Sequence, residues 1–389
     1  MKKSLVKKIS TVLVLTVAVG MGLSGCGGKD QGQQAPAGGN DQKQEQQAES
    51  QGLDKVTAGF IYIGSAKDGG YSQVHDEGRE AAIAAIGEDK VATIVNEDVA
   101  EDQSVEKVMN DMIDQGANII FANSYGYMDY VEKVAKENPD VKFMHFSGYK
   151  LGDNYGNYFG RMYEPRYLSG IAAGMTTKNN QIGYVAAMPT PEVVRGINAF
   201  TLGVRSVNPE ATVKVMWTNT WYDPAKETAA AETLLDAGVD TIAQHQDTTS
   251  AQQAAAKAGA FSVGYNKDMS AANPEGFICS PVWHLGAIYT EQIQAVLDGT
   301  WEAQAYWGGM KDGVVGLSDF GSCVTDETKA AVEEAQAKIE SGELFVFAGP
   351  IKDQNGEIAV EEGQKLTDEE MLSMMWFVEG VDGTIPTSN

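Results

Sequence analysis

The apolar residues of this chain gather in short runs that alternate with longer stretches carrying apolar side chains on one side. Short runs rich in Ile, Val and Phe predict buried strands, and the longer stretches predict helices. In the first half, the expected strands are 55–64, 91–95, 118–123 and 141–146, and the expected helices are 72–86, 104–115 and 128–137. Strands and helices that alternate in this order predict a parallel sheet with helices on both faces.

The same alternation begins again after residue 180. Here the expected strands are 181–187, 212–219, 241–244 and 262–265, and the expected helices are 192–207, 225–237 and 250–258. The unit is therefore built twice, and residues 163–176 lie between the copies. A helix at 285–298 and strand-like runs at 314–317 and 344–348 are expected to cross back between them.

We therefore predict an α/β protein of two lobes, each a parallel sheet with helices on both faces. Residues 54–162 and about 281–312 would form the first lobe, and about 163–280 and 313–389 the second. Ligands bind outside the carboxyl ends of the strands in such sheets. Two lobes that face each other would bury a ligand in one cleft between those ends.

Candidate site residues in the first lobe follow two predicted strands. Tyr71 comes directly after Gly69 and Gly70, and an aromatic ring there could stack on a flat ligand. The alternative is that Tyr71 packs on its own helix. Asn123, with Ser124 and Tyr125 after it, ends another strand, where its amide offers both donors and acceptors. The alternative for Asn123 is a helix cap.

In the second lobe, Trp217, Asn219 and Trp221 alternate, so they would share one side if the strand continued that far. Trp221 is nearer the carboxyl end and is the tryptophan we expect in the cleft. The polar run 244–247 ends another strand, and Asp247 could bind a ring N–H or a ribose diol.

Two further residues, Asp268 and Trp283, could each belong to the site or have another role. Asp268 is a second candidate carboxylate, although a lone acid in a loop is usually solvated. Trp283 would either form a wall of the cleft or pack at the hinge.

The N-terminus has the layout of an export signal. Four lysines precede residue 9, and the run 9–23 is mostly apolar or small, as in a secretory signal peptide. The sequence Leu-Ser-Gly-Cys that ends at Cys26 resembles a bacterial lipobox, which implies lipid on Cys26; the alternative is an ordinary signal with a chance cysteine. We therefore expect a signal peptide at 1–25 and a flexible tether at 26–53, whose residues 27–51 include no large apolar side chain. Lipid at Cys26 would anchor the protein to the membrane outside the cytoplasm.

Charge and cysteine content limit the possible partners. The chain of 389 residues has a net charge of −25, and removal of the signal would take away four more lysines and no acid. This balance argues against nucleic acid and against an anionic bilayer surface as ligands. After Cys26 only Cys279 and Cys323 remain, and the sequence leaves open whether they pair. No second apolar run approaches the roughly 20 residues of a spanning helix.

Sequence signatures of catalysis are missing. The four histidines form no HExxH pair, and the chain has no Cys-x-x-Cys, no phosphate-binding loop and no G-x-S-x-G elbow. We predict neither a metal nor a cofactor, and no enzymatic activity. A Ser/His/Asp triad assembled from distant residues remains the alternative.

Nine short segments resemble the basic membrane protein family of solute-binding lipoproteins. They are GFIYIG at 59–64, DGGYS at 68–72, HDEGR at 75–79, FANSYGYM at 121–128, YFGR at 158–161, VVRGINAF at 193–200, WTNTWYDP at 217–224, QHQD at 244–247 and GYNKDM at 264–269. The resemblance implies a type I periplasmic-binding-protein fold and service to an ATP-driven importer through its permease. It also implies a purine nucleoside or purine base as ligand.

The function expected from the sequence is therefore extracytoplasmic capture of a purine. The ring would stack between Tyr71 and Trp221, and Asn123, Asn219 and Asp247 would bond its edge. A surface sensor with the same cleft is the first alternative, and a lipid-anchored nucleoside hydrolase is the second.

Overall fold

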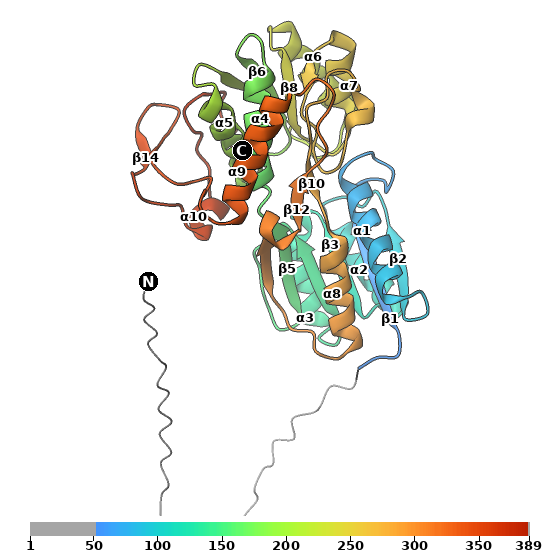
Figure 1. Ribbon diagram of the computed structural model, residues 1–389. Coiled ribbons are helices and arrows are strands. Elements are labelled where there is room, and N and C mark those ends of the chain that lie inside the picture. The colour runs from blue at the N-terminus through green and yellow to red at the C-terminus, as the bar shows by residue number, and fades with distance from the viewer. Residues whose placement is uncertain (1–51, 388–389) are drawn as a thin grey trace, which may run out of the picture. The chain divides into compact units, whose positions relative to one another are not determined.

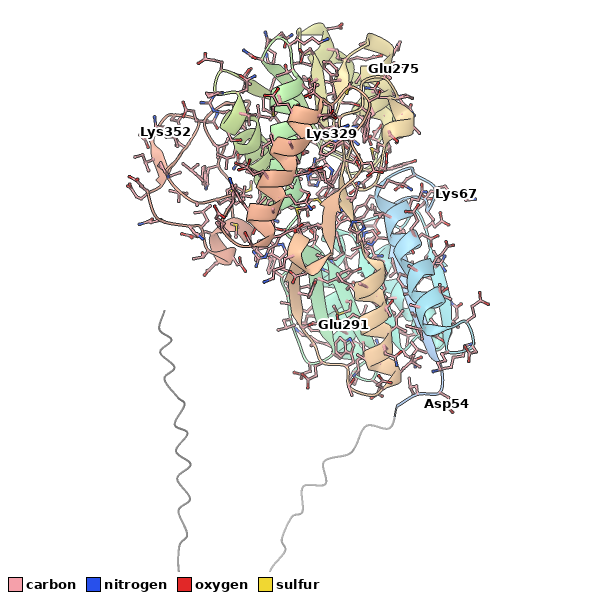
Figure 2. The ribbon with its side chains drawn as sticks, viewed as in Figure 1. Asp54, Lys67, Glu275, Glu291, Lys329 and Lys352 are labelled. Carbon is pink, nitrogen blue, oxygen red and sulfur yellow. The ribbon has the colours of Figure 1, made fainter. Side chains whose placement is uncertain are left out.

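The computed structural model describes residues 52–387, which form two α/β lobes (Figure 1). The expected signal peptide, Cys26 and all but the end of the expected tether lie outside the described residues. Many charged side chains lie on the outer surface, and Figure 2 shows Lys67, Glu275 and Glu291 among them.

The first lobe is built on a parallel sheet with the strand order β11-β5-β4-β3-β1-β2. Its strands are β1 (Val56–Tyr62), β2 (Val91–Asn96), β3 (Ile119–Asn123), β4 (Lys142–Phe146), β5 (Tyr155–Gly160) and β11 (Ala305–Gly308). Its helices are α1 (Tyr71–Ile86), α2 (Ser104–Asp114), α3 (Met128–Glu137) and α8 (Gly286–Leu297).

Successive residues of β1 in this sheet point to opposite faces. Phe60 belongs to the same apolar cluster as Val74 of α1 and Tyr289 of α8, whereas Ile61 packs with Met109 of α2 and residues of α3. Helices therefore cover both faces, and α1 and α8 lie side by side over one of them (Figure 1).

The second lobe has the parallel strand order β15-β7-β6-β8-β9. Its strands are β6 (Gln181–Ala186), β7 (Thr212–Trp217), β8 (Thr241–His245), β9 (Phe261–Ser262) and β15 (Val381–Asp382). Its helices are α4 (Tyr163–Thr176), α5 (Pro191–Val207), α6 (Pro224–Asp236), α7 (Ser250–Ala258) and α9 (Asp326–Glu340). Val185 of β6 packs with α6 and α7, and its neighbour Tyr184 packs with the cluster that includes α4 and α5, so this sheet is also covered on both faces.

The chain passes between the lobes after β5, after β9 and after β11. In the later two passages, β10 (Pro281–Trp283) pairs antiparallel with β12 (Val315–Leu317). Short 3-10 turns are present at Tyr125–Tyr127, Ser270–Ala272 and Met310–Asp312. This connectivity leaves the carboxyl ends of both parallel sheets facing one interlobe cavity.

The C-terminal segment packs on the second lobe. After α9 it forms β13 (Ile351–Lys352), β14 (Ile358–Val360) and α10 (Asp368–Leu372), and it ends with β15 beside β7. The side chain of Asn198 in α5 fastens it, because Nδ2 donates to the Trp376 carbonyl at 2.7 Å and Oδ1 accepts from the Val378 amide at 3.0 Å. Arg161, at the passage after β5, adds a two-pronged ion pair with Asp368 at 2.8 and 2.7 Å.

The predicted alternation of strands and helices is confirmed, and its errors have local causes. The strand predicted at 344–348 is wrong, because these residues form turns and irregular backbone. β5 was not predicted, since its sequence YGNYFG mixes aromatic residues with glycines and an asparagine and contains no aliphatic run. Cys279 and Cys323 are both free.

Close packing of α4 against α5 depends on glycines, and we expect Gly203→Ala to disturb it. A Cβ at Gly203 would lie 2.0 Å from the Tyr167 carbonyl oxygen, so the two helix backbones must move apart. We expect the free energy of unfolding to fall by roughly 1–3 kcal/mol, measured by urea denaturation in sodium phosphate.

Gly196→Ala in the same helix is the matched control. Its Cβ would meet nothing closer than 3.5 Å, so we expect no comparable loss of stability. Equal losses in the two variants would contradict the packing argument.

Candidate ligand-binding site

A cavity lies between the lobes, at the carboxyl ends of both sheets. The free volume between its lining side chains is only about 20 Å³. The first lobe contributes Tyr71, Ser124, Tyr125 and Ser147, and the second contributes Glu192, Trp221, His245, Asp247 and Tyr265. This volume is far below the roughly 300–1,000 Å³ of a typical small-molecule pocket, so the lobes must move apart for a ligand to enter.

Tyr71 enters the cavity from the first residue of α1. Gly69 before it has φ +80°, a conformation that favours glycine. Asp68 fixes the turn, since its carboxylate accepts from the Gly70 amide at 2.8 Å and from the Ser72 amide at 2.7 Å. The Tyr71 ring packs edge-on against His75, with centroids 4.6 Å apart. The turn and the helix start therefore hold this ring in place.

Four aromatic side chains line the cavity. Tyr71 and Tyr125 come from the first lobe, and Trp221 and Tyr265 come from the second. Trp221 lies in the loop after β7, with its ring centroid 6.3 Å from that of His245. Tyr265 follows β9, and its ring is 4.5 Å from His245. A flat ring bound here would be bordered by aromatic surfaces of both lobes.

Asp247 is the acidic group in the cavity that its neighbours leave unpaired. It follows β8, it is 4% exposed, and no donor among residues 52–387 bonds its carboxylate. Its backbone bridges two other lining residues, because its carbonyl accepts from the Tyr71 amide at 3.3 Å and its amide donates to the Trp221 carbonyl at 3.3 Å. Burial raises the pKa of Asp247 well above its ordinary value, and the nearby acids Asp68, Glu227 and Glu192 raise it further. A ligand N–H is the partner that this carboxylate lacks.

Glu192 is tied to both lobes. It accepts from Ser147 Oγ of the first lobe at 2.5 Å and lies 3.3 Å from His245 Nε2 of its own lobe. Burial alone would raise the pKa of Glu192, but the bonds from His245 and Ser147 hold it below its ordinary value. Burial lowers the pKa of His245 to about 4. At neutral pH a neutral His245 therefore donates through Nε2 to an ionised Glu192.

The structure brings Tyr71, Ser124, Tyr125, Trp221 and Asp247 together in the cavity. The other candidate residues lie elsewhere. Asn123 is buried and is not among the lining residues, and its Oδ1 accepts from the Tyr158 hydroxyl at 2.6 Å. Asp268 is exposed and accepts from the Ser270 amide at 2.7 Å.

Asn219 and the two tryptophans do not share one side, and that expectation is wrong. β7 ends at Trp217, and Asn219 has φ 55° and is exposed. Trp217 donates from Nε1 to the Thr384 carbonyl at 2.9 Å and so packs under the C-terminal segment.

Trp283 is buried beside the passage between the lobes and is not part of the cavity lining. Its Nε1 donates to Asn266 Oδ1 at 3.2 Å, and its ring lies 5.0 Å from Phe146 and 5.1 Å from Phe159. Its contacts are those of hinge packing, the second alternative given above.

Sequence reasoning missed Ser147, Glu192 and Tyr265 as lining residues. Each comes shortly after a strand, the position at which the other candidates were sought. Glu192 was included in the predicted helix 192–207, and an acid in the first turn of a helix is common for reasons unrelated to ligands. The signal was therefore present but not distinctive.

A second cavity adjoins the first and shares Tyr125, Ser147 and Glu192 with it. Its volume is about 450 Å³, and it is bordered by Tyr149, Phe159, Arg195 and residues of the C-terminal segment. The bond between Ser147 and Glu192 lies where the two cavities meet.

Within residues 52–387, no group of three or more His, Cys, Asp or Glu is placed to hold a metal ion. No helix in that range has the length and apolar character needed to cross a bilayer.

Solved structures share this architecture. A solute-binding protein of an ABC transporter system from Aeropyrum pernix superposes with a TM-score of 0.67 at 20% identity, over 77% of this chain and 93% of its own. One from Conexibacter woesei gives 0.61 at 23% identity, over 75% and 98%. The predicted type I periplasmic-binding-protein fold is confirmed.

Relatives in sequence extend over most of the chain. A purine-binding protein of Brucella abortus is 44% identical over 86% of this chain and 95% of its own length. A Haloferax volcanii protein named as an ABC transporter glucose-binding protein is 42% identical over 85% and 82%. Residues 55–346 match the profile of the Bmp family, described as PnrA-like ABC transporter substrate-binding proteins. The chain therefore belongs to the Bmp family of ABC transporter substrate-binding proteins, the family that its sequence motifs resemble.

Proposed function

We propose that this protein captures a purine base outside the cytoplasm and delivers it to the permease of an ABC importer. The observation that carries the proposal is the composition of the cavity, in which four aromatic rings surround one unpaired carboxylate. Base–aromatic stacking is worth roughly 1–3 kcal/mol per base. Asp247 would accept from a ring N–H or an exocyclic amine, and the purine-binding relative supports this ligand class.

The polar inventory of the cavity favours a purine over a sugar. A hexose carries a hydroxyl on nearly every carbon, and each buried hydroxyl needs a partner. Ser147 and His245 already bond Glu192, and Ser124 bonds Glu101 at 2.6 Å. Asp247 and the hydroxyls of Tyr71, Tyr125 and Tyr265 are left to bond the ligand, and these few groups on an aromatic lining match a flat ring better than a polyol.

The extent of the cavity favours the base over its nucleoside. The bond from Ser147 to Glu192 separates the space between Tyr71 and Trp221 from the larger neighbouring cavity. A ribose would require that bond to break. We further propose that lipid on Cys26 anchors the protein to the membrane, as the sequence before that residue indicates.

Titration calorimetry of the dialysed protein tests the proposal. We expect saturable heats with adenine, guanine or hypoxanthine, and weaker or no heats with the matching nucleosides. Glucose and uracil serve as controls and should give none. Saturable binding of glucose without any purine response would overturn the ligand assignment, and tighter binding of nucleosides than bases would overturn the size argument alone.

A further inference from the structure

The unpaired carboxylate of Asp247 has other acids as its charged neighbours. Asp68 and Glu101 belong to the first lobe, and Glu192 and Glu227 belong to the second. Burial is the largest cause of the raised pKa of Asp247, and the charges of these four acids raise it further. Among residues 52–387 none of the five acids forms an ion pair with a lysine or an arginine. Acids of both lobes therefore make the surroundings of the cavity electronegative.

Neutral donors hold the four neighbouring acids in place. Glu101 accepts from the Ser124 hydroxyl at 2.6 Å, and Glu227 accepts from the Thr248 hydroxyl. The other two accept from backbone amides, a serine hydroxyl and a neutral imidazole, as described above. These bonds fix the side chains but add no positive charge beside Asp247.

The cavity lining contains no lysine or arginine. Its histidine, His245, is uncharged at neutral pH because burial lowers its pKa to about 4. Burial raises the pKa of the Tyr71 and Tyr265 hydroxyls, and the charge of Asp247 contributes to both shifts. These hydroxyls therefore stay neutral as well. The positive charge that would balance Asp247 is missing from the lining.

The two buried arginines of the second lobe are bound elsewhere. Arg166 donates to the Gln244 carbonyl at 2.5 Å, and Arg195 donates to the Met371 carbonyl at 2.7 Å. Neither is among the residues that line the cavity between Tyr71 and Asp247.

The charge of the ligand then decides how well it matches the site. A neutral purine can donate an N–H to Asp247, but it leaves a buried carboxylate without a counter-charge, which is costly. A positively charged ring supplies a counter-charge. The faces of Tyr71, Tyr125, Trp221 and Tyr265 also attract cations, because aromatic rings carry negative charge on their faces.

We propose that the cavity selects purines whose ring is positively charged, either through an alkylated ring nitrogen or through a proton held by a strongly basic ring. The proposal rests on the purine function above and narrows its ligand class. When Asp247 holds a proton in the free protein, the arriving cation displaces that proton into solvent. The carboxylate left behind then pairs with the ring, so binding releases up to one proton.

Two isomers of methyladenine test the selection by titration calorimetry. 1-Methyladenine is a strong base that is mostly cationic at pH 6 and mostly neutral at pH 8.5, whereas N6-methyladenine is neutral at both. At pH 6 we expect 1-methyladenine to bind about tenfold or more tightly than its isomer, since a charge-assisted hydrogen bond is roughly twice as strong as a neutral one. The difference should shrink at pH 8.5. Titrations at pH 6 in two buffers of different ionisation enthalpy should show proton release with 1-methyladenine.

Asp247→Asn keeps the shape of the side chain and removes its charge. We expect this variant to lose the preference for 1-methyladenine at pH 6. Glu77→Gln is the matched control, because it removes a half-exposed carboxylate at the lobe interface that does not line the cavity. It should keep the wild-type preference.

The outcomes separate this proposal from the purine assignment itself. Equal affinity for the two isomers at pH 6, or a preference that persists in Asp247→Asn, would overturn the charge selection and leave purine capture in place. If neither isomer nor adenine bound, the purine function and the selection that rests on it would both be wrong.

Discussion

Asp247→Ala is expected to lower the affinity for the purine by about 10- to 150-fold. The variant removes the acidic acceptor that the protein leaves unpaired in the cavity. A hydrogen bond to a charged group contributes about 1.5–3 kcal/mol, and 1.4 kcal/mol is a factor of ten. Calorimetry with the purine that binds wild type best measures the effect. Unchanged affinity would show that Asp247 does not touch the ligand.

The isosteric Asp247→Asn should at the same time stabilise the ligand-free protein at neutral pH. Burial raises the pKa of Asp247 in the folded state, so the folded state binds a proton more tightly than the unfolded state, whose Asp pKa is about 3.9. The stability of the wild type is therefore greatest below the unfolded-state pKa of about 3.9. It falls as the pH rises from there toward the raised pKa of the folded state. Asparagine does not titrate, so we expect its Tm advantage at pH 7–8 to disappear near pH 4. An advantage that does not change with pH would contradict the titration argument.

Gly70→Ala is expected to prevent the lobes from closing on the ligand. A Cβ at Gly70 would lie 2.1 Å from the Asp247 carbonyl oxygen in the other lobe, and neither backbone can yield without opening the cavity. Overpacking typically costs 1–3 kcal/mol, and a backbone contact takes the upper end, so we expect about 100-fold weaker purine binding. The first lobe alone carries Gly70, so its folding should be little affected. Calorimetry and small-angle scattering measure affinity and opening.

Glu77→Gln is the control at the same interface. It removes the ion pair between Glu77 and Lys267 across the lobes, at 2.5 Å, without adding bulk. Because Glu77 is half exposed, the pair should contribute less than about 1 kcal/mol. Wild-type affinity in Gly70→Ala, with the scattering profile of the closed form, would refute the steric argument.

The sheets were predictable because their strands are buried on both faces and read as apolar runs. The lining residues Tyr71, Trp221 and Asp247 were found because they are unusual residues at strand ends. The position of Asn219 could not be predicted in this way. Its own backbone is left-handed after the end of β7, and its side chain is exposed. A period-two pattern does not reveal where a strand stops.

Some features required the three-dimensional structure because they depend on distant partners. β11 pairs with β5 far from it in sequence, and the bond from Ser147 to Glu192 joins two lobes. The acids that act on Asp247 come from both lobes, so their proximity could not be read from the sequence.

The passages between the lobes also constrain how the molecule can be made. β11 and α8 of the first lobe follow β9 of the second in the chain, and α9 and β15 of the second follow β11 of the first. A chain emerging from the ribosome therefore cannot complete its first lobe before most of its second lobe has been made. Neither lobe corresponds to one continuous stretch of gene, so no single split of the coding region gives two products that each contain one complete lobe.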